Sequence, residues 1–150
     1  MSAHSPRASR DFPGTVEAAA DAEGWVSCAA NGLDLADDAE FAIALCLEEL
    51  FLNAVKHGRA SRATVSLWVE PDGARLEFID DGAPFDPSAA PAKRIEGPTH
   101  DFAIGGYGAG LVQKFSRRIS YSRVGGWNRL LLEFDAHRNA DAPAETLGEH

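Results

Sequence analysis

The chain has 150 residues, of which 45% are hydrophobic and 25% are charged, a composition typical of one soluble globular domain. Its formal net charge of −9 disfavours nucleic acid as a partner, because binding to the phosphate backbone depends on Lys and Arg. No apolar run approaches the roughly 18 residues of a membrane-spanning helix, and the first ten residues lack the apolar core of a secretory signal. We therefore expect a cytoplasmic protein that binds no membrane.

Both ends of the chain are rich in Ala, Pro, Ser and charged residues and show no apolar periodicity. We expect residues 1–12 and 136–150 to be flexible tails, and residues 13–135 to form the domain. Cys28 and Cys46 fall within apolar helical patterns, which favours reduced thiols over a disulfide or a metal site.

Two helices are expected first. Apolar residues recur at helical spacing after Pro13 until Gly32 ends the pattern. A second pattern begins at Asp34 or Asp37, continues through the apolar stretch FAIALCLEELFLNAVKH, and ends at Gly58, a typical residue just after a helix C-terminus. This second helix is the clearest element of the sequence.

Strand patterns occupy the second half of the chain. Residues 62–70 alternate between apolar and polar, a Pro-Asp-Gly turn follows, and residues 76–79 mark a returning strand. Residues 82–104 have little periodicity, so we expect a long loop that acts as a lid. A short helix at 111–115 and a second hairpin, with strands at 119–123 and 127–134, complete the domain. This order suits a two-layer α/β sandwich, with helices on one face of a mainly antiparallel sheet.

The central turns of the apolar second helix are interrupted chiefly by Glu48, Glu49 and Asn53. Since Glu49 and Asn53 are four residues apart, they project from one face, where a carboxylate and an amide together can bind a hydrated Mg²⁺. Alternatively, Glu49 lies on the solvent side and Asn53 bonds a neighbouring loop. Lys56, in the next turn, could reach a phosphate. Alternatively, its positive charge could simply interact favourably with the negative, C-terminal end of the helix dipole.

The sequence Asp80-Asp81-Gly82-Ala83-Pro84 follows the second strand directly. It is an ordinary turn or part of a site. In a site, a carboxylate at the strand end could accept a hydrogen bond from an exocyclic amine such as that of adenine. Gly82 would allow the base to approach the backbone.

Four glycines in six residues precede the short third helix, within the segment Gly105, Gly106, Tyr107, Gly108, Ala109, Gly110 and Leu111. Exposed backbone N–H groups at the start of a helix can hold phosphate oxygens. A flexible linker is the alternative. A dinucleotide fingerprint of the Rossmann type is rejected, because the run follows a long loop late in the chain.

Taken in order, these three segments resemble the N, G1 and G2 boxes of the GHKL ATPases, which include DNA gyrase and histidine kinases. The segments EELFLNAVKHG, IDDGAPFDP and GGYGAGLVQKF are most similar to the anti-sigma-factor serine/threonine kinases of bacterial partner-switching systems. The resemblance covers about residues 12–134 and implies the Bergerat ATP-binding fold.

The resemblance also implies ATP and Mg²⁺ as cofactors. Asn53 would ligate Mg²⁺, and Glu49 would act as the general base toward a serine hydroxyl or a water. Asp80 would accept from the adenine amine with Gly82 beside the ring, and the loop at 86–104 would be the ATP lid. The other expected nucleotide-binding residues are Lys56, Pro84, Gly105, Gly106, Tyr107, Gly108, Ala109, Gly110 and Leu111.

The sequence departs from this pattern in the late strand at 128–134, which lacks the threonine that many members of the superfamily carry near the phosphates. We expect a protein-serine/threonine kinase that phosphorylates a small antagonist protein and sequesters a sigma factor or similar regulator. An ATP-responsive binding module without phosphotransfer and a detached histidine kinase catalytic domain remain the alternatives. Dimerisation through the first helix, near Trp25, is a further expectation.

Overall fold

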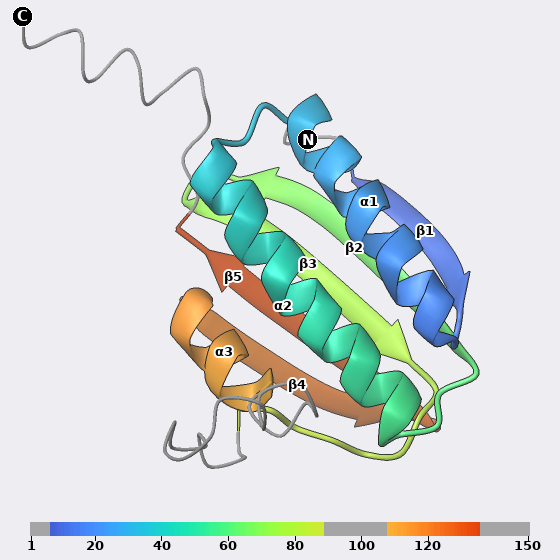
Figure 1. Cartoon of the computed structure of the whole chain (residues 1–150). Coiled ribbons are helices and arrows are strands. Elements are labelled where there is room, and N and C mark those ends of the chain that lie inside the picture. Colours follow the sequence, from blue (N-terminus) through green and yellow to red (C-terminus); the bar gives the residue numbers. More distant parts are fainter. Residues whose placement is uncertain (1–6, 89–107, 136–150) are drawn as a thin grey trace, which may run out of the picture.

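The computed structural model describes residues 7–88 and 108–135 (Figure 1). Within this part, the chain forms a five-stranded sheet in the order β1-β2-β3-β5-β4, and every neighbouring pair is antiparallel. The elements are β1 Ala8–Pro13, α1 Val16–Gly32, α2 Asp37–Lys56, β2 Arg62–Glu70, β3 Gly73–Asp80, α3 Gly108–Phe115, β4 Arg118–Val124 and β5 Trp127–Phe134.

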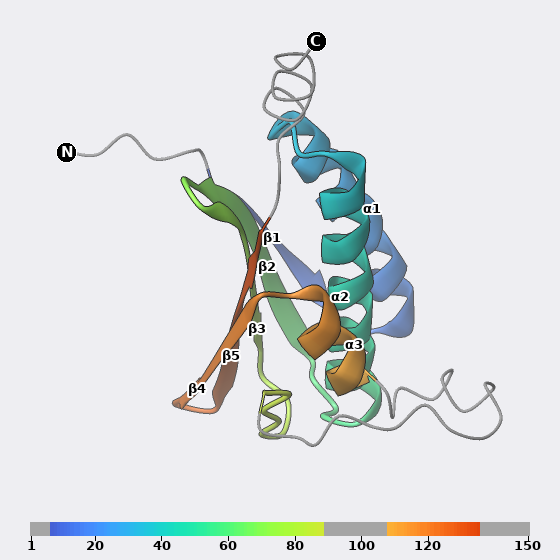
Figure 2. The ribbon, with the colours of Figure 1, turned by 90° about the vertical axis from the view of Figure 1, so that its left-hand side faces the viewer.

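The three helices lie together on one face of the sheet, as Figure 2 shows. Side chains alternate between the two faces of a strand, and the apolar ones point to the helices; examples are Val65 and Leu67 on β2 and Leu130 and Leu132 on β5, all of them buried. The predicted two-layer α/β sandwich, with helices on one face of an antiparallel sheet, is thus confirmed.

Local signals explain where the helices lie. The Thr15 hydroxyl caps α1 by accepting a hydrogen bond from the Ala18 N–H at 3.1 Å. The helix α2 buries an apolar face that includes Phe51, whose ring packs edge-on against those of Phe12 and Phe78. Among the described residues, none of the helices is both long and apolar enough to cross a membrane.

The first strand is the main correction to the expected organisation. We expected residues 1–12 to form a flexible tail, but β1 pairs with β2 from Ala8 to Pro13. Only Phe12 of this edge strand is buried, so the segment has little of the apolar alternation that identifies a strand. Cross-strand polar pairs take its place: the Ser66 hydroxyl donates to that of Ser9. Residues 1–6 and 136–150 lie outside the described part.

Candidate functional site

The C-terminal half of α2 presents Glu49 and Asn53 one helical turn apart, and both side chains are partly exposed. In residues 7–88 and 108–135, neither side chain has a hydrogen bond or an ion pair. The bond from Asn53 to a neighbouring loop, which was the alternative to metal binding, is therefore not present in that part. Both groups are available to a ligand there.

Glu49 has a perturbed carboxyl group. Burial raises its pKa above the ordinary value of 4.5, and the negative charge of Glu48 raises it further, whereas the positive charge of Lys56 acts in the opposite direction. Lys56 itself is exposed in the last turn of α2. A carboxylate with a raised pKa has a stronger tendency to accept a proton, which is what a general base requires.

A close contact between two glycines joins the end of α2 to the turn after β3. The Ala83 N–H donates to the Gly58 carbonyl at 2.9 Å. A Cβ on Gly82 would lie 2.9 Å from the same carbonyl oxygen, and a Cβ on Gly58 would lie 2.9 Å from the Ala54 carbonyl oxygen. Only glycine fits at these positions, so the turn that carries Asp80 is held beside the helix that carries Asn53.

Asp80 ends β3 with its side chain on the helix face of the sheet, and it is only 4% exposed. Its Oδ1 accepts hydrogen bonds from the Gly82 N–H at 2.7 Å and from the Asn128 Nδ2 at 3.1 Å. Oδ2 has no partner within the described residues. Burial raises the pKa of Asp80, and the two hydrogen bonds oppose this increase. The arrangement leaves one carboxylate oxygen to accept from a ligand.

Asp81 has a structural role at the same turn. Its carboxylate accepts from the backbone N–H groups of Ser61 and Arg62 and from the Ser61 hydroxyl. Partial desolvation acts to raise the pKa of Asp81, but these hydrogen bonds hold it below its ordinary value. Of the two neighbouring carboxylates, Asp81 thus fixes the start of β2, and Asp80 remains for a ligand.

Asn128 is a residue of this cluster that none of the three sequence motifs contains. It lies opposite Asp80 in the β3–β5 register and is only 2% exposed. Besides Asp80, its Nδ2 donates to the carbonyls of Gly82 and Ala83, at 3.3 and 2.9 Å. The alternation of β5 would have placed this amide on the buried face, and a buried amide needs partners.

Two side chains of β4 contact this asparagine from its other side. The Tyr121 hydroxyl and the Arg123 Nη1 donate to its Oδ1, at 2.6 and 3.0 Å. Arg123 Nη1 also donates to the Gly82 carbonyl at 2.7 Å. Strand β4 therefore completes a polar network around Asp80, to which the late strand β5, without the threonine of many superfamily members, contributes Asn128.

The third helix begins at Gly108, so the expected start at Leu111 is wrong by one turn. Gly108, Ala109, Gly110 and Leu111 form the first turn of α3 that the structure describes, and the N–H groups at the start of a helix can in general hold an anion. Gly105, Gly106 and Tyr107 lie outside the described residues, as does most of the expected lid. The Gln113 Nε2 donates to the Pro87 carbonyl at 2.7 Å, which connects α3 to the chain after Asp80.

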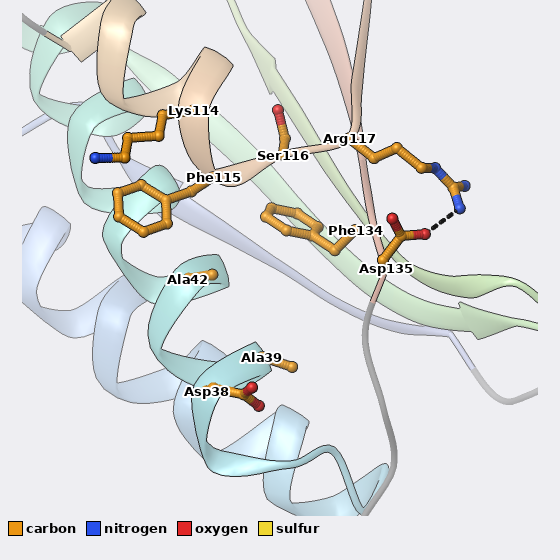
Figure 3. Close-up of a pocket in the computed structure, with 9 residues that line it drawn as sticks. All are labelled: Asp38, Ala39, Ala42, Lys114, Phe115, Ser116, Arg117, Phe134 and Asp135. Atoms are coloured by element: carbon orange, nitrogen blue, oxygen red, sulfur yellow. Dashed lines mark hydrogen bonds and ion pairs between the residues drawn. The ribbon is translucent and has the colours of Figure 1, made fainter.

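A groove of about 320 Å³ opens elsewhere, between the start of α2, the end of α3 and the end of β5 (Figure 3). Its lining includes Ala39, which precedes Asn53 by 14 residues and hence by about 20 Å along the helix axis. The groove is therefore separate from the cluster around Asp80. Arg117 lines it but is already paired with Asp135 at 2.5 Å.

The sequence-family model of the histidine kinase-like ATPase domain matches residues 12–134. This range includes all the described helices and strands apart from the first residues of β1. The chain belongs to this family. The resemblance inferred from the three motifs is thus confirmed, and membership in this ATPase family implies that the domain binds ATP.

Two relatives agree with this assignment. The ATPase domain is 31% identical over 96 residues to the serine/threonine-protein kinase BtrW of Bordetella bronchiseptica, covering 61% of this chain and 68% of BtrW. Its fold is similar to the RsbU and RsbW domains of Rv1364c from Mycobacterium tuberculosis, with a TM-score of 0.62 and 17% identity. That match covers 89% of this chain but only 32% of the other, and it shows the fold alone.

Proposed function

We propose that this ATPase domain is a protein-serine/threonine kinase of the anti-sigma-factor type. It transfers the γ-phosphoryl group of ATP to a small antagonist protein, and it sequesters a sigma factor or similar regulator when unphosphorylated antagonist is scarce. The observation that carries the proposal is the position of Glu49 and Asn53 on α2, the helix whose end contacts the Asp80 turn through Gly58. The similarity to BtrW supports a kinase rather than another ATPase.

The described residues fit Mg²⁺ and adenine. Asn53 offers an amide oxygen that has no partner in the described part of the chain, a ligand type that Mg²⁺ accepts alongside phosphate oxygens and waters. Mg²⁺ would supply neutralisation of the phosphate charge. Asp80 offers Oδ2 to the exocyclic amine of adenine, and the first turn of α3, from Gly108 to Leu111, offers N–H groups to the phosphates.

Glu49 is the group to which we assign the proton transfer. Its carboxylate accepts the proton of a serine hydroxyl as that oxygen bonds the γ-phosphorus. The bond from this phosphorus to the oxygen that bridges to the β-phosphate breaks, and ADP leaves with the electron pair. Phosphoryl transfer depends chiefly on positioning and on electrostatic stabilisation, which a domain of this size can provide. Burial and Glu48 raise the pKa of Glu49 in the direction that suits a base.

The proposal is tested by incubating the purified protein with Mg²⁺, γ-labelled ATP and candidate antagonist proteins. We expect acid-stable label on a serine or threonine of one antagonist, and no label when Glu49→Ala replaces the wild type. Acid-labile label would indicate phosphohistidine and overturn the serine kinase assignment. ATP binding without any label would indicate a partner-switching module that does not transfer phosphate.

The homodimer remains a separate proposal. Trp25 is partly buried and packs edge-on against Phe12, whereas Val16, at the start of α1, is 49% exposed. An apolar side chain at this point could extend a surface between two copies. Light scattering of the wild type and of Val16→Glu would test this: a monomer in both cases rejects the dimer.

A further inference from the structure

We propose that Asn128 positions Asp80 for recognition of adenine, through an amide that Tyr121 and Arg123 hold in one orientation. This inference rests on the proposed function, because it assumes that Asp80 binds the exocyclic amine. Asn128 does not itself reach the base in this assignment. It is a positioning residue, and β4 becomes part of the nucleotide site through it.

The first step is the distribution of bonds on Asp80. Its Oδ1 accepts from the Gly82 N–H and from the Asn128 Nδ2, at 2.7 and 3.1 Å. These two donors lie on one oxygen, so the carboxylate cannot rotate without breaking both of them. Oδ2 is consequently the oxygen presented to a ligand, in one fixed direction.

The second step is the orientation of the Asn128 amide. Oδ1 receives donors from Tyr121 and Arg123, and Nδ2 faces acceptors on Asp80 and on two backbone carbonyls. A flipped amide would place its oxygen against those acceptors and its NH₂ group against the two donors. The network therefore defines which end of the amide contacts Asp80, and this is the standard basis for assigning such an orientation.

The third step concerns the shape of the turn. Asn128 and Arg123 together donate to both the Gly82 and Ala83 carbonyls. These bonds hold the backbone beside the expected base, and the Gly58 contact holds it from the helix side. Loss of Asn128 would chiefly release the carboxylate, because Arg123 and Gly58 would still hold the backbone of Gly82 and Ala83.

Specificity follows from this geometry. An unprotonated carboxylate accepts hydrogen bonds but cannot donate them, so a fixed Oδ2 favours a purine with an amine at position 6. A purine with hydrogen at that position gains nothing from Asp80. The difference in affinity between ATP and purine riboside triphosphate, which lacks the amine, therefore measures how well Asp80 is positioned.

The experiment compares the affinities of both nucleotides, with Mg²⁺, for the full chain and three variants by titration calorimetry. For Asn128→Ala we expect about tenfold weaker binding of ATP and little change for the analogue, since one charged hydrogen bond is misdirected. Tyr121→Phe keeps the asparagine but removes one of its donors, and we expect a smaller loss of the same kind. Ser122→Ala, adjacent to Tyr121 and on the opposite face of β4, is the matched control.

The outcomes distinguish failure of the adenine-binding role of Asp80 from failure of the positioning role of Asn128. A wild type that binds both nucleotides equally would overturn the adenine role of Asp80 itself. A wild type that prefers ATP, combined with an Asn128→Ala variant that keeps the full preference, would overturn only the positioning role. An equal loss for both nucleotides would likewise assign Asn128 a purely structural role. Should Asn128→Ala fail to fold, the preference of Tyr121→Phe decides, with an unchanged ratio rejecting the inference.

Discussion

The paired strands β3 and β5 carry a polar cluster at each end, and the two clusters lie on opposite faces of the sheet. Asp80 faces Asn128 at one end, and Arg75 faces Glu133 at the other, five residues or about 17 Å away along the strand. The first pair is buried on the helix face of the sheet. The second belongs to a network on the opposite face, in which Arg117 also pairs with Asp72, Glu133 and Asp135.

The two clusters differ in whether all of their charged groups have partners. In the arginine network, acidic groups surround Arg117, and hydrogen bonds to Glu133 and Asp135 raise the pKa of its guanidinium. At the Asp80 end, one carboxylate oxygen has no partner within the described residues, although the group is buried. A carboxylate oxygen without a protein partner can accept a hydrogen bond from a ligand, whereas the acidic groups around Arg117 are already paired with it.

Glu49→Gln should have the largest effect on the phosphotransfer rate, because it changes the proposed general base. The amide cannot accept the proton of the serine hydroxyl, so we expect the phosphotransfer rate to fall about 100-fold to 10,000-fold. Binding of ATP should stay near the wild-type value, because the side chain keeps its size. Single-turnover transfer to the antagonist measures the rate, and calorimetry measures binding. A rate within a few-fold of the wild type would rule out Glu49 as the base.

Asp80→Asn should weaken ATP binding about 100-fold, as expected for loss of a hydrogen bond to a charged acceptor and its replacement by a clash of donors. The Gly82 and Asn128 donors would keep the amide oxygen at the Oδ1 position. The new NH₂ group would then face the adenine amine. Calorimetric titration with ATP provides the measurement.

The neighbouring carboxylate provides the matched control. Asp81 bonds Ser61 and Arg62 at the start of β2, so Asp81→Asn should lower the melting temperature and leave ATP affinity nearly unchanged. If instead Asp81→Asn abolished binding and Asp80→Asn did not, the assignment of the two carboxylates would have to be exchanged.

Gly82→Ala tests the contact that joins the Asp80 turn to α2. The added Cβ would lie 2.9 Å from both the Gly58 carbonyl oxygen and the Asp80 Oδ1, and overpacking of this kind costs about 1–3 kcal/mol of folding free energy. Denaturant unfolding measures this loss. At Gly24, in α1, a Cβ would meet nothing within 4 Å, so Gly24→Ala should stabilise the protein by about 0.5–1 kcal/mol. Equal effects at both positions would contradict the close contact.

Much of this architecture was predictable from the sequence because its signals are local. Helical periodicity located α1 and α2, and alternation located both hairpins. The edge strand β1 escaped prediction, since its pairing with β2 involves mostly polar residues. Membership of the family followed from three motifs, each of which depends on residues close together in the chain.

The sequence can indicate that Asn128 is buried, but it does not indicate the partners in the polar network around Asp80, because they come from different strands. Asn128 and Asp80 are 48 residues apart, and only the β3–β5 register brings them together. The sequence shows that the usual threonine is absent from the late strand, but it does not show what replaces it. The contact between Gly58 and Gly82 is hidden for the same reason, since Gly58 alone indicates only the end of a helix.

Removal of the negative charge of Glu48 and removal of the positive charge of Lys56 should shift the pH dependence of phosphotransfer in opposite directions. Only the carboxylate accepts a proton, so the rate falls as the pH decreases through the Glu49 pKa. Burial is the larger cause of the raised pKa, and Glu48 adds to it. Glu48→Gln should therefore move the acid limb of the pH–rate profile to lower pH, and Lys56→Met should move it to higher pH. Rates at saturating ATP provide the test, and shifts of the same sign would contradict it.

Arg117→Ala should have the smallest effect, although within residues 7–88 and 108–135 this side chain makes more ion pairs than any residue of the site. Of its partners within the described residues, Asp72 and Asp135 are exposed and Glu133 is partly buried, and exposed pairs contribute little because water screens their charges. We expect a slightly lower melting temperature and unchanged ATP affinity and transfer rate. A large loss of ATP affinity would mean that the two ends of the β3–β5 pair are coupled. The number of polar contacts would then be a better guide to function than a carboxylate oxygen that has no partner.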